Sequence, residues 1–485
     1  MNAIQRADQS DEFAGIRALI VGFAREGTAL ARFLLGRGAQ VTVTDIRPAE
    51  ALDARIGAIS KEGIGFSLGG HPLSLLDRVD IVFVSPGVPL DIPILVEARK
   101  RALPLSSETR AFTHACPAPV VGITGSSGKT TATALVGDML GGTRRRVWVG
   151  GNIGEPLINH LQEMEPSDVV VMELSSFQLE LFAAWQGALV PKDGVLFESD
   201  GWSPHVAALL NITPNHLDRH GTMEAYSAAK ANILGYQGID DYAVVGYDDP
   251  RTRELGQTPG WVQQVVWFGL DRRPLDGAFL SGDSLIQRWQ GDEQTVCRKG
   301  DLKLLGEHNL ANTLAAIAIA TAAGAPLDAV KSTATTFRGV EHRLELVRER
   351  KGVRWYNDSI ATAPERTMAA MRAFEAPVVL LAGGRDKHLP WDGLAALAWK
   401  KARHLILLGE AAELIESAML ESPVADADTC RLHRVDSMAA AVELAATLSR
   451  PGDVVLLSPG GTSFDMYTDY AERGDHFRQL VKALD

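Results

Sequence analysis

One segment of the chain limits the possible folds more than any other: residues 120–140 combine an apolar run, a glycine-rich turn and a helical pattern. The turn and the first helical positions are Gly125, Ser126, Ser127, Gly128, Lys129, Thr130 and Thr131. In such a turn the backbone N–H groups and the helix N-terminus bind phosphate oxygens, while a lysine reaches the outer phosphates and a hydroxyl binds Mg²⁺. A standard phosphate loop has a further glycine where Ile123 stands, so we predict a shortened nucleotide-binding loop.

Apolar runs and helical stretches alternate along most of the chain. Such alternation is typical of parallel sheets covered by helices, so we predict an α/β fold. The chain has 485 residues, which is more than one hydrophobic core usually holds, and a stretch broken by prolines at 104–119 marks a first boundary. The predicted domains are residues 1–107, 108–339 and 340–485. Short glycine- and aspartate-containing runs within 239–305 predict an antiparallel flank, and residues 307–323 predict a helix.

The charge and the cysteines exclude several classes of protein. Acidic residues outnumber basic ones by 60 to 48, and the net charge of −12 argues against nucleic acid or an anionic membrane as the main partner. No apolar run is long enough to span a membrane, and the N-terminus lacks the apolar region of a signal peptide. The three cysteines, Cys116, Cys297 and Cys430, fit no zinc spacing, so we expect reduced thiols in a cytoplasmic protein.

Three further residues are candidates for a metal site. Glu173 ends a predicted strand, where a carboxylate of a nucleotide-binding sheet can bind a metal ion. His216 follows another predicted strand and could join the same cluster, although a single histidine is more often structural. Lys230 lies in a helical stretch, and the simplest interpretation is a lysine that faces solvent.

The N-terminal part carries an incomplete dinucleotide-binding pattern. Gly22 and Gly27 flank a turn after a predicted strand, but Ala24 replaces the middle glycine, and Asp45 follows at the end of the next strand. The backbone of this turn can still bind a diphosphate. An NAD(P)-dependent oxidoreductase is the alternative that this pattern alone would favour.

The order of the sequence blocks resembles the Mur ligases, and among them those that add glutamate to UDP-N-acetylmuramoyl-L-alanine. The similarity covers nearly the whole chain, in the blocks ITGSSGKTT, GNIG, ELSSFQLE, NITPNHLDRHGTMEAYSAAK, GEHNLANTLAA, GVEHRLE, NDSIATA, LLAGGRDK and LLSPGGTSFD. It implies three α/β domains, with a Rossmann-like N-terminal domain for UDP, a central ATP-binding domain of the P-loop type and a Rossmann-like C-terminal domain. It also implies a step in the synthesis of peptidoglycan precursors in the cytoplasm.

The resemblance implies an ATP-dependent reaction through an acyl phosphate. It assigns Lys129 to the transferring phosphoryl group, Thr130 and Glu173 to one Mg²⁺ ion, and His216 to a second. Lys230 matches a lysine that the family carbamylates, which would present anionic oxygens to the two ions. Catalytic roles for His216, Lys230, Arg343 and Asp358 are implied in the same way.

The remaining site residues are also implied by the resemblance. Residues matching the ATP site, besides the phosphate turn, are His308, Asn309, Asn312, Arg343 and Asp358. Residues matching the UDP-substrate site are Gly22, Ala24, Arg25, Asp45, Arg47, Ser85, Gly87, Asn152 and Ser175. Residues matching the amino-acid pocket are Thr362, Lys387, Ser463 and Tyr470. A monomer is expected.

The amino-acid pocket departs from the common pattern of the family. Ile360 stands where the form that adds D-glutamate has a lysine, Arg385 could supply a replacement cation, and the late motif is SPGGTS. These changes look more like a branch that adds L-glutamate, which we predict as the substrate, with D-glutamate as the alternative. A related amide ligase such as a folylpolyglutamate synthase and a non-catalytic protein that binds a UDP-sugar both stay open as hypotheses. The segment 183–203 matches no block of the family.

Overall fold

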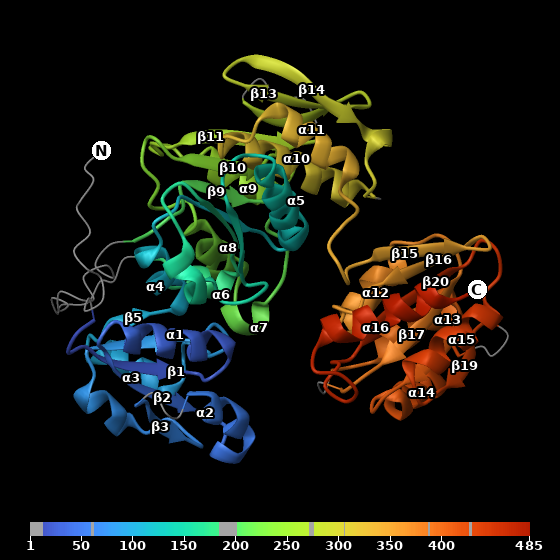
Figure 1. Cartoon of the computed structure of the whole chain (residues 1–485), viewed down its shortest axis with the longest axis horizontal. Coiled ribbons are helices and arrows are strands. Elements are labelled where there is room, and N and C mark those ends of the chain that lie inside the picture. Colours follow the sequence, from blue (N-terminus) through green and yellow to red (C-terminus); the bar gives the residue numbers. More distant parts are fainter. Residues whose placement is uncertain are drawn as a thin grey trace. The chain divides into compact units, whose positions relative to one another are not determined.

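A computed structural model of the chain describes residues 13–59, 63–183, 201–270, 276–304, 306–386, 389–425 and 429–485. The chain divides into two compact units, and the boundary between them lies between Thr336 and Phe337. Two sheets lie in the first unit and one in the second (Figure 1). The predicted α/β class with parallel sheets is confirmed, whereas the domain boundaries at 107/108 and 339/340 stay predictions. In the part of the chain that the structure describes, no helix is long and apolar enough to cross a membrane.

The first sheet of unit one is wholly parallel, in the order β3-β2-β1-β4-β5. Its strands are β1 (Arg17–Val21), β2 (Gln40–Asp45), β3 (Gly65–Leu68), β4 (Ile81–Val84) and β5 (Leu105–Ser106). Its helices are α1 (Arg25–Gly36), α2 (Asp53–Ile59) and α3 (Pro93–Lys100), with short 3₁₀ turns at Ala49–Leu52 and Leu73–Arg78. Along β1, Ile20 packs toward α1 while Leu19 and Val21 pack toward α3. Both faces of the sheet are therefore buried, as a parallel sheet requires.

The second sheet has nine strands, in the order β14-β13-β12-β11-β10-β9-β6-β8-β7. Its first five strands along the chain are β6 (Val120–Thr124), β7 (Val147–Gly151), β8 (Val169–Glu173), β9 (Val206–Leu209) and β10 (Tyr242–Gly246). The others are β11 (Gln264–Gly269), β12 (Gly277–Ser281), β13 (Ser284–Trp289) and β14 (Asp292–Arg298). The pairs β12–β13 and β13–β14 are antiparallel, which confirms the predicted flank.

The helices around this sheet follow the sequence pattern closely. They are α4 (Glu108–Ala115), α5 (Lys129–Gly141), α6 (Ser176–Leu179), α7 (Leu217–His220), α8 (Met223–Ala231), α9 (Pro250–Gly256), α10 (Glu307–Ala322) and α11 (Leu327–Thr336), with 3₁₀ turns at Leu157–Glu163 and Lys299–Asp301. The predicted helix over 307–323 is α10. The strand predicted before His216, over residues 209–216, is placed too late, because the strand is VAAL of β9 and residue 211 already lies in a loop. Most of the unmatched segment 183–203, residues 184–200, lies outside the described residues.

The position of β6 gathers the candidate site at one edge of this sheet. β6 pairs with β8 on one side and with β9 on the other, all in parallel. The segments after the three strands, beginning at Gly125, Leu174 and Leu210, therefore leave the sheet at the same edge. Ligands of parallel sheets bind at this carboxyl edge.

The second unit holds a six-stranded sheet in the order β15-β16-β20-β17-β18-β19. Its strands are β15 (Glu345–Arg350), β16 (Val353–Asn357), β17 (Val378–Gly383), β18 (Ala402–Leu408), β19 (Arg431–Arg434) and β20 (Val454–Gly460). Its helices are α12 (Pro364–Arg372), α13 (Asp392–Lys401), α14 (Ala412–Glu421), α15 (Met438–Leu448) and α16 (Tyr470–Ala483). Helices α12, α13 and α14 pack on one face, and α15 and α16 on the other.

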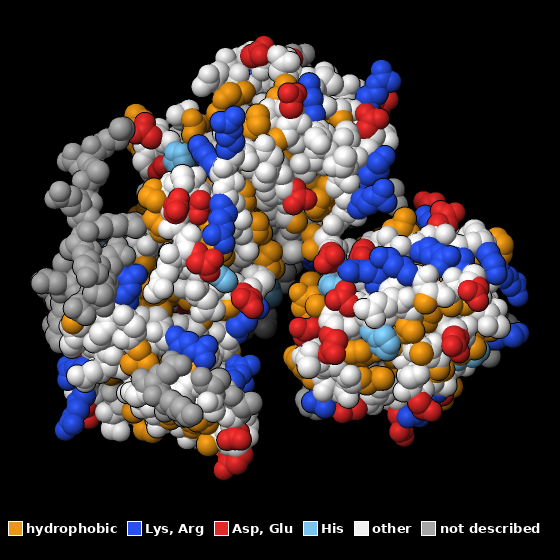
Figure 2. Space-filling model, viewed as in Figure 1, with side chains coloured by type: hydrophobic (Ala, Val, Ile, Leu, Met, Phe, Trp, Pro, Cys, Tyr) orange, Lys and Arg blue, Asp and Glu red, His pale blue; other side chains and the backbone are white. Residues whose placement is uncertain are grey.

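The edge strand β15 pairs with β16 in the antiparallel sense. Basic side chains gather over β15 and β16 on the face that Figure 2 shows. They include Arg348, Arg350, Lys351 and Arg354, while Glu345 and Glu349 add negative charges on the same elements. A charged edge of this kind disfavours pairing with a strand of another chain.

Leu456 provides a test of the core of the second unit. Its side chain is fully buried on the central strand β20. We expect Leu456→Ala to lower the free energy of unfolding by about 2–5 kcal/mol, because it leaves a cavity. The measurement is the urea concentration at which peptides covering β20 lose hydrogen-exchange protection. The control Leu420→Ala, at a side chain 67% exposed on α14, should change stability by no more than ~0.5 kcal/mol. Equal effects of the two variants would contradict this packing.

Candidate active site

The phosphate turn is held in shape from two sides. Gly128 has a φ of +81°, and a Cβ at this position would lie 2.2 Å from Oδ1 of Asn312 on α10. Only glycine fits both conditions. The backbone N–H of Ser127 donates to Oδ1 of Asn211 at 2.9 Å, and the Ser126 hydroxyl contacts the Tyr226 hydroxyl at 2.9 Å. The turn is therefore fixed by α10, by the loop after β9 and by α8.

Two lysine amines converge on one backbone oxygen in this turn. Nζ of Lys129 and Nζ of Lys230 each donate to the Gly125 carbonyl at 2.9 Å, and Lys230 also donates to Oγ1 of Thr124 at 3.2 Å. Lys230 is only 1% exposed, so the interpretation of a solvent-facing helix lysine is wrong. Burial and the nearby charge of Lys129 lower the pKa of Lys230 to about 7, although the charge of Glu173 acts in the opposite direction.

Glu173 presents a carboxylate oxygen that no protein group satisfies. Its side chain is buried, and Oε1 accepts a hydrogen bond from Nδ2 of Asn152 at 2.8 Å. Oε2 is buried without a hydrogen-bond partner among the described residues. A buried carboxylate oxygen of this kind is expected to meet a cation. Thr130, the second residue of α5, is half-buried at the start of the same helix as Lys129. These residues fit a magnesium ion, whose preferred ligands are oxygens.

His216 packs against the segment that follows β8, in the same unit. It has a φ of +53° just before α7, and its ring lies 5.0 Å from the ring of Phe177, edge to face. Phe177 also contacts Arg219 and His220. Arg219 forms an ion pair with Glu180, and Nδ1 of His220 lies 3.1 Å from the Glu180 carboxylate. The segment after Glu173 thus packs against the loop of His216.

The other predicted residues of the nine-stranded sheet lie on its helices. Ser175 caps α6 and accepts a hydrogen bond from the Gln178 N–H at 3.2 Å. His308, Asn309 and Asn312 occupy the first turns of α10, where Asn312 contacts Asn309 at 3.3 Å. Thr131 is buried in the first turn of α5. The structure therefore brings Asn312 to the phosphate turn.

The predicted UDP-substrate residues gather at the carboxyl edge of the first sheet. Gly22 has a φ of +100°, and Oγ of Ser85 donates to its carbonyl at 2.9 Å. Asp45 accepts a short hydrogen bond from the Phe23 N–H, at 2.7 Å, and pairs with Arg47 through two side-chain hydrogen bonds. Burial alone would raise the pKa of Asp45, but these hydrogen bonds and the Arg47 charge hold it well below its usual range.

Three more residues of this predicted set lie in the neighbouring turns. Ala24 precedes α1, Arg25 is its first residue, and Gly87 follows β4 by three positions. The N-terminus of α1 consequently faces the same edge as Asp45 and Ser85, which suits an anionic ligand.

The second unit places Asp358 in a buried hydrogen-bond network. Its carboxylate accepts hydrogen bonds from Oγ of Ser458 at 2.8 Å and from the Leu344 N–H at 3.2 Å. Burial raises the pKa of Asp358 to about 7, although these bonds and the charges of Arg343 and Arg366 oppose the shift. Arg343 lies between His342 and Leu344, which both have positive φ angles, so its backbone is tightly constrained.

The predicted amino-acid residues lie on separate turns of this unit. Thr362 follows β16 by five positions, Ser463 is buried after β20, and Tyr470 begins α16 with a ring 39% exposed. Lys387 lies outside the described residues. Arg385, proposed from sequence as a replacement cation, instead donates two hydrogen bonds to the Glu410 carboxylate, at 2.8 and 2.9 Å. Its charge is therefore already paired.

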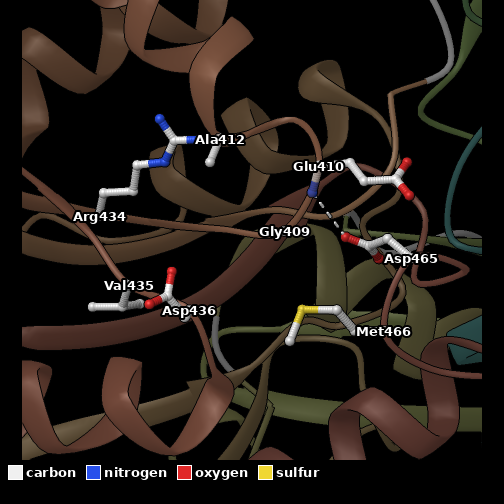
Figure 3. A pocket seen from close by; sticks show the side chains of 8 residues that line it. All are labelled: Gly409, Glu410, Ala412, Arg434, Val435, Asp436, Asp465 and Met466. Carbon is white, nitrogen blue, oxygen red and sulfur yellow. Dashed lines mark hydrogen bonds between the residues drawn. The ribbon is translucent and has the colours of Figure 1, made fainter.

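A cavity of about 260 Å³ opens at the carboxyl ends of β18 and β19. It is lined by Gly409, Glu410, Ala412, Arg434, Val435, Asp436, Asp465 and Met466. Figure 3 shows Arg434 and Asp436 across from Asp465, whose carboxylate accepts a hydrogen bond from the Glu410 N–H at 3.1 Å. The sequence predicted none of these lining residues as part of the site.

The sequence is similar to three family models along the chain. Residues 16–106 match the Mur ligase MurD-like N-terminal domain, residues 123–320 match the Mur ligase middle domain, and residues 342–461 match the Mur ligase glutamate ligase domain. These matches leave the oxidoreductase alternative, which used the first sheet alone, without support.

Two relatives that align over nearly their whole length carry the same name. The proteins of Symbiobacterium thermophilum and Pelotomaculum thermopropionicum, each called UDP-N-acetylmuramoylalanine–D-glutamate ligase, are 42% and 37% identical to this chain. The alignments cover 96% and 98% of this chain and 98% and 99% of the relatives. Among solved structures, UDP-N-acetylmuramate–alanine ligase of Thermotoga maritima is similar with a TM-score of 0.53 at 21% identity, over 96% of this chain and 99% of that chain. MurF of Acinetobacter baumannii has a TM-score of 0.55 at 17% identity, over 96% and 93%.

The pKa of Asp358 makes a prediction about stability. Its folded value of about 7 lies above the ordinary value of 3.8, so the folded chain binds the proton more tightly than the unfolded chain. The resulting stabilisation is complete below pH 3.8 and is lost as the pH rises through 7. We expect Asp358→Asn to remove this loss, so that the variant gains stability relative to the wild type between pH 4 and 8.

The urea midpoint for loss of exchange protection in β20, taken across this pH range, measures the effect. Asp436→Asn, at an exposed carboxylate of the same unit, is the control and should follow the wild type. Parallel pH profiles for wild type and Asp358→Asn would refute the raised pKa.

Proposed function

The chain belongs to the Mur ligase family, and we propose that it joins D-glutamate to UDP-N-acetylmuramoyl-L-alanine in an ATP-dependent reaction. The observation that carries the proposal is the phosphate turn, where Lys129 and Lys230 converge on Gly125 close to the unsatisfied carboxylate of Glu173. This arrangement combines a phosphate-binding loop with an acidic metal ligand, as transfer of the ATP phosphoryl group requires. In this proposal residues 1–107, 108–339 and 340–485 bind the UDP-substrate, ATP and the amino acid, respectively.

The choice of D-glutamate replaces the preference for L-glutamate that the sequence pattern suggested. That preference is not supported, because the relatives of full length at 37–42% identity are named for D-glutamate. The use of Arg385 as a replacement cation, which was one argument for L-glutamate, also loses support. Arg385 is paired with Glu410 rather than open to a substrate carboxylate. Ile360 remains a departure that the pocket must compensate elsewhere.

The reaction proceeds in two steps. The carboxylate of the UDP-substrate attacks the γ-phosphorus of ATP, so that an acyl phosphate forms and ADP leaves. The neutral amine of glutamate then attacks the acyl carbon, and the tetrahedral intermediate expels phosphate while the amine loses a proton. Lys129 neutralises the charge of the transferring phosphoryl group, and the N–H groups of the turn orient it.

The proposed metal ligands are Thr130, Glu173, His216 and a carbamylated Lys230. Two Mg²⁺ ions bound by this set would neutralise phosphate charge and orient the phosphates. Carbamylation joins the neutral amine of Lys230 to CO₂ and releases one proton. The lowered pKa of this lysine, about 7, supports the step, because a substantial fraction of the amine is uncharged near neutral pH. The carbamate would replace a cation with an anion beside Glu173.

The remaining residues are assigned by the contacts around them. We assign His308, Asn309 and Asn312 to the base and ribose of ATP, because they begin the helix that fixes the phosphate turn, and Arg343 and Asp358 to the same nucleotide. The UDP diphosphate is assigned to the α1 N-terminus, with Gly22, Asp45 and Arg47 near the uracil end. Thr362, Lys387, Ser463 and Tyr470 are assigned to glutamate.

Phosphate release tests the proposed function directly. The purified chain is assayed with ATP, Mg²⁺ and UDP-N-acetylmuramoyl-L-alanine, with D-glutamate and L-glutamate side by side. We expect release that requires both substrates, with kcat/KM for D-glutamate more than tenfold above that for L-glutamate, or about 1.4 kcal/mol in transition-state binding. A preference of the same size for L-glutamate would refute the choice of enantiomer. Release that is independent of either substrate would refute the ligase.

Removal of the Lys129 amine should separate catalysis from substrate binding. We expect Lys129→Ala to lower turnover by at least a hundredfold, because loss of such a transition-state contact costs on the order of several kcal/mol. Binding of the UDP-substrate, measured by calorimetry, should stay unchanged, since the proposed site for its UDP end lies on the other sheet of the unit. Lys299→Ala, at an exposed lysine, is the control. More than a tenth of wild-type activity in Lys129→Ala would contradict the role.

A further inference from the structure

A buried guanidinium on α16 joins two turns of the second unit. Arg473 is 3% exposed. Its Nε donates to Oγ of Ser359 at 3.0 Å, and Nη2 donates to the Ser359 carbonyl at 2.9 Å. Nη1 and Nη2 both donate to the Gly461 carbonyl at 3.2 Å. Ser359 lies in the turn after β16, and Gly461 lies in the turn after β20.

A third turn packs against the same guanidinium. A Cβ added to Gly384 would lie 3.0 Å from Nη1 of Arg473, so this glycine of the turn after β17 leaves room for the side chain. Strands β16, β20 and β17 are neighbours in the sheet. The turns after β16 and β20 carry Thr362 and Ser463, two of the residues assigned to glutamate. Tyr470, also assigned to glutamate, begins the helix of Arg473, and its carbonyl accepts a hydrogen bond from Oγ of Ser359 at 2.7 Å.

The acceptors of Arg473 are all neutral. They are one hydroxyl and two backbone carbonyls, and among the described residues no carboxylate forms an ion pair with it. Burial lowers the pKa of Arg473 to about 10, which still leaves it protonated at neutral pH, and the charge of Asp465 only partly opposes this shift. By contrast, Arg385 and Arg478 of the same unit are paired with Glu410 and Glu345.

An unpaired buried cation is unfavourable unless an anion completes its surroundings. The carboxyl edge of the three strands is where a ligand of a parallel sheet binds. The positive potential of the Arg473 guanidinium therefore acts on the region assigned to a dicarboxylate amino acid. In this pocket Ile360 stands where the family pattern has a lysine, so that cation is missing.

We propose that Arg473 is a positioning and specificity-determining residue for glutamate, which aligns the three pocket turns and supplies the positive charge that favours a second carboxylate. It does this from behind the turns, without contact to the substrate. The inference rests on the proposed function and goes beyond it, because it explains how a pocket without a lysine at position 360 selects an acidic amino acid.

The test compares Arg473→Met and Arg473→Lys with Arg348→Met. Arg348 is a matched control, because its guanidinium also donates to backbone carbonyls, those of Val481, Lys482 and Leu484 at the other end of α16. For each variant, the KM values for D-glutamate, ATP and the UDP-substrate are measured, together with the Ki of D-glutamine as a competitor. D-glutamine has nearly the same shape but only one carboxylate.

We expect Arg473→Met to raise the KM for D-glutamate at least tenfold and to raise the Ki of D-glutamine at most threefold, while the KM values for ATP and the UDP-substrate stay within twofold. Arg473→Lys, which keeps the charge but loses the bridge, should recover the preference for glutamate over glutamine while both constants remain raised. Arg348→Met should leave all constants within twofold of the wild type.

Equal losses for glutamate and glutamine in Arg473→Met would overturn the electrostatic role, and an unchanged KM for glutamate would overturn the proposal entirely. If Arg473→Met is unfolded at the assay temperature, Arg473→Lys and Ser359→Ala decide: both should raise the KM for D-glutamate at least threefold, and an unchanged KM in both overturns the proposal. Failure of the proposed function is distinguishable, because wild-type protein would then show no release of phosphate that depends on glutamate.

Discussion

The carbonyl oxygen of Gly125 accepts hydrogen bonds from two lysine amines, and the chemistry proposed for the first unit depends on this contact. Two cations so close together repel each other, and burial removes the water that would screen them, so one of them loses its proton near neutral pH. The lowered pKa of Lys230 is the result. The nearby Glu173 offsets part of this repulsion, yet one of its carboxylate oxygens still has no partner among the described residues. The site therefore favours the binding of further cations and the conversion of the Lys230 amine into an anion.

The second unit also has two buried ionisable side chains, Asp358 and Arg473, and burial shifts the pKa of each. Asp358 is a carboxyl group whose pKa burial raises to about 7, and Arg473 is a guanidinium that donates hydrogen bonds only to neutral groups among the described residues. Arg473 is held by carbonyls of the turns after β16 and β20, whereas Asp358 is held by the Ser458 hydroxyl of β20 and by the Leu344 N–H. An edge with a buried cation that no carboxylate pairs among the described residues suits anionic ligands, which is consistent with the proposed binding of a dicarboxylate and of ATP.

Much of the fold followed from local sequence patterns, because strands, glycine turns and helices along the chain each have a local signature. The phosphate turn, the α10 helix and the antiparallel flank were predicted in this way. The burial of Lys230 was not predicted. A helical pattern around Lys230 does not indicate that its amine contacts Gly125, which lies 105 residues earlier in the chain. The strand before Asn211 was placed too late, because the apolar run continues past the last paired residue, Leu209. Arg473 was not predicted as a site residue, because only the order of the strands brings its partners, Ser359 and Gly461, to it. The pairing of Arg385 with Glu410 likewise could not be seen from the motif alone, and Arg385 as a replacement cation was one argument for L-glutamate.

The proposed carbamylation requires that the Lys230 amine is sufficiently uncharged to take up CO₂ and to become an anionic ligand. Carbon-13 NMR of the full chain in ¹³C-bicarbonate, near neutral pH and with Mg²⁺, detects the product. We expect a carbamate resonance that is present in the wild type and in Lys299→Ala but absent from Lys230→Ala. A wild-type enzyme that is active as a ligase and shows no carbamate resonance dependent on Lys230 would contradict it.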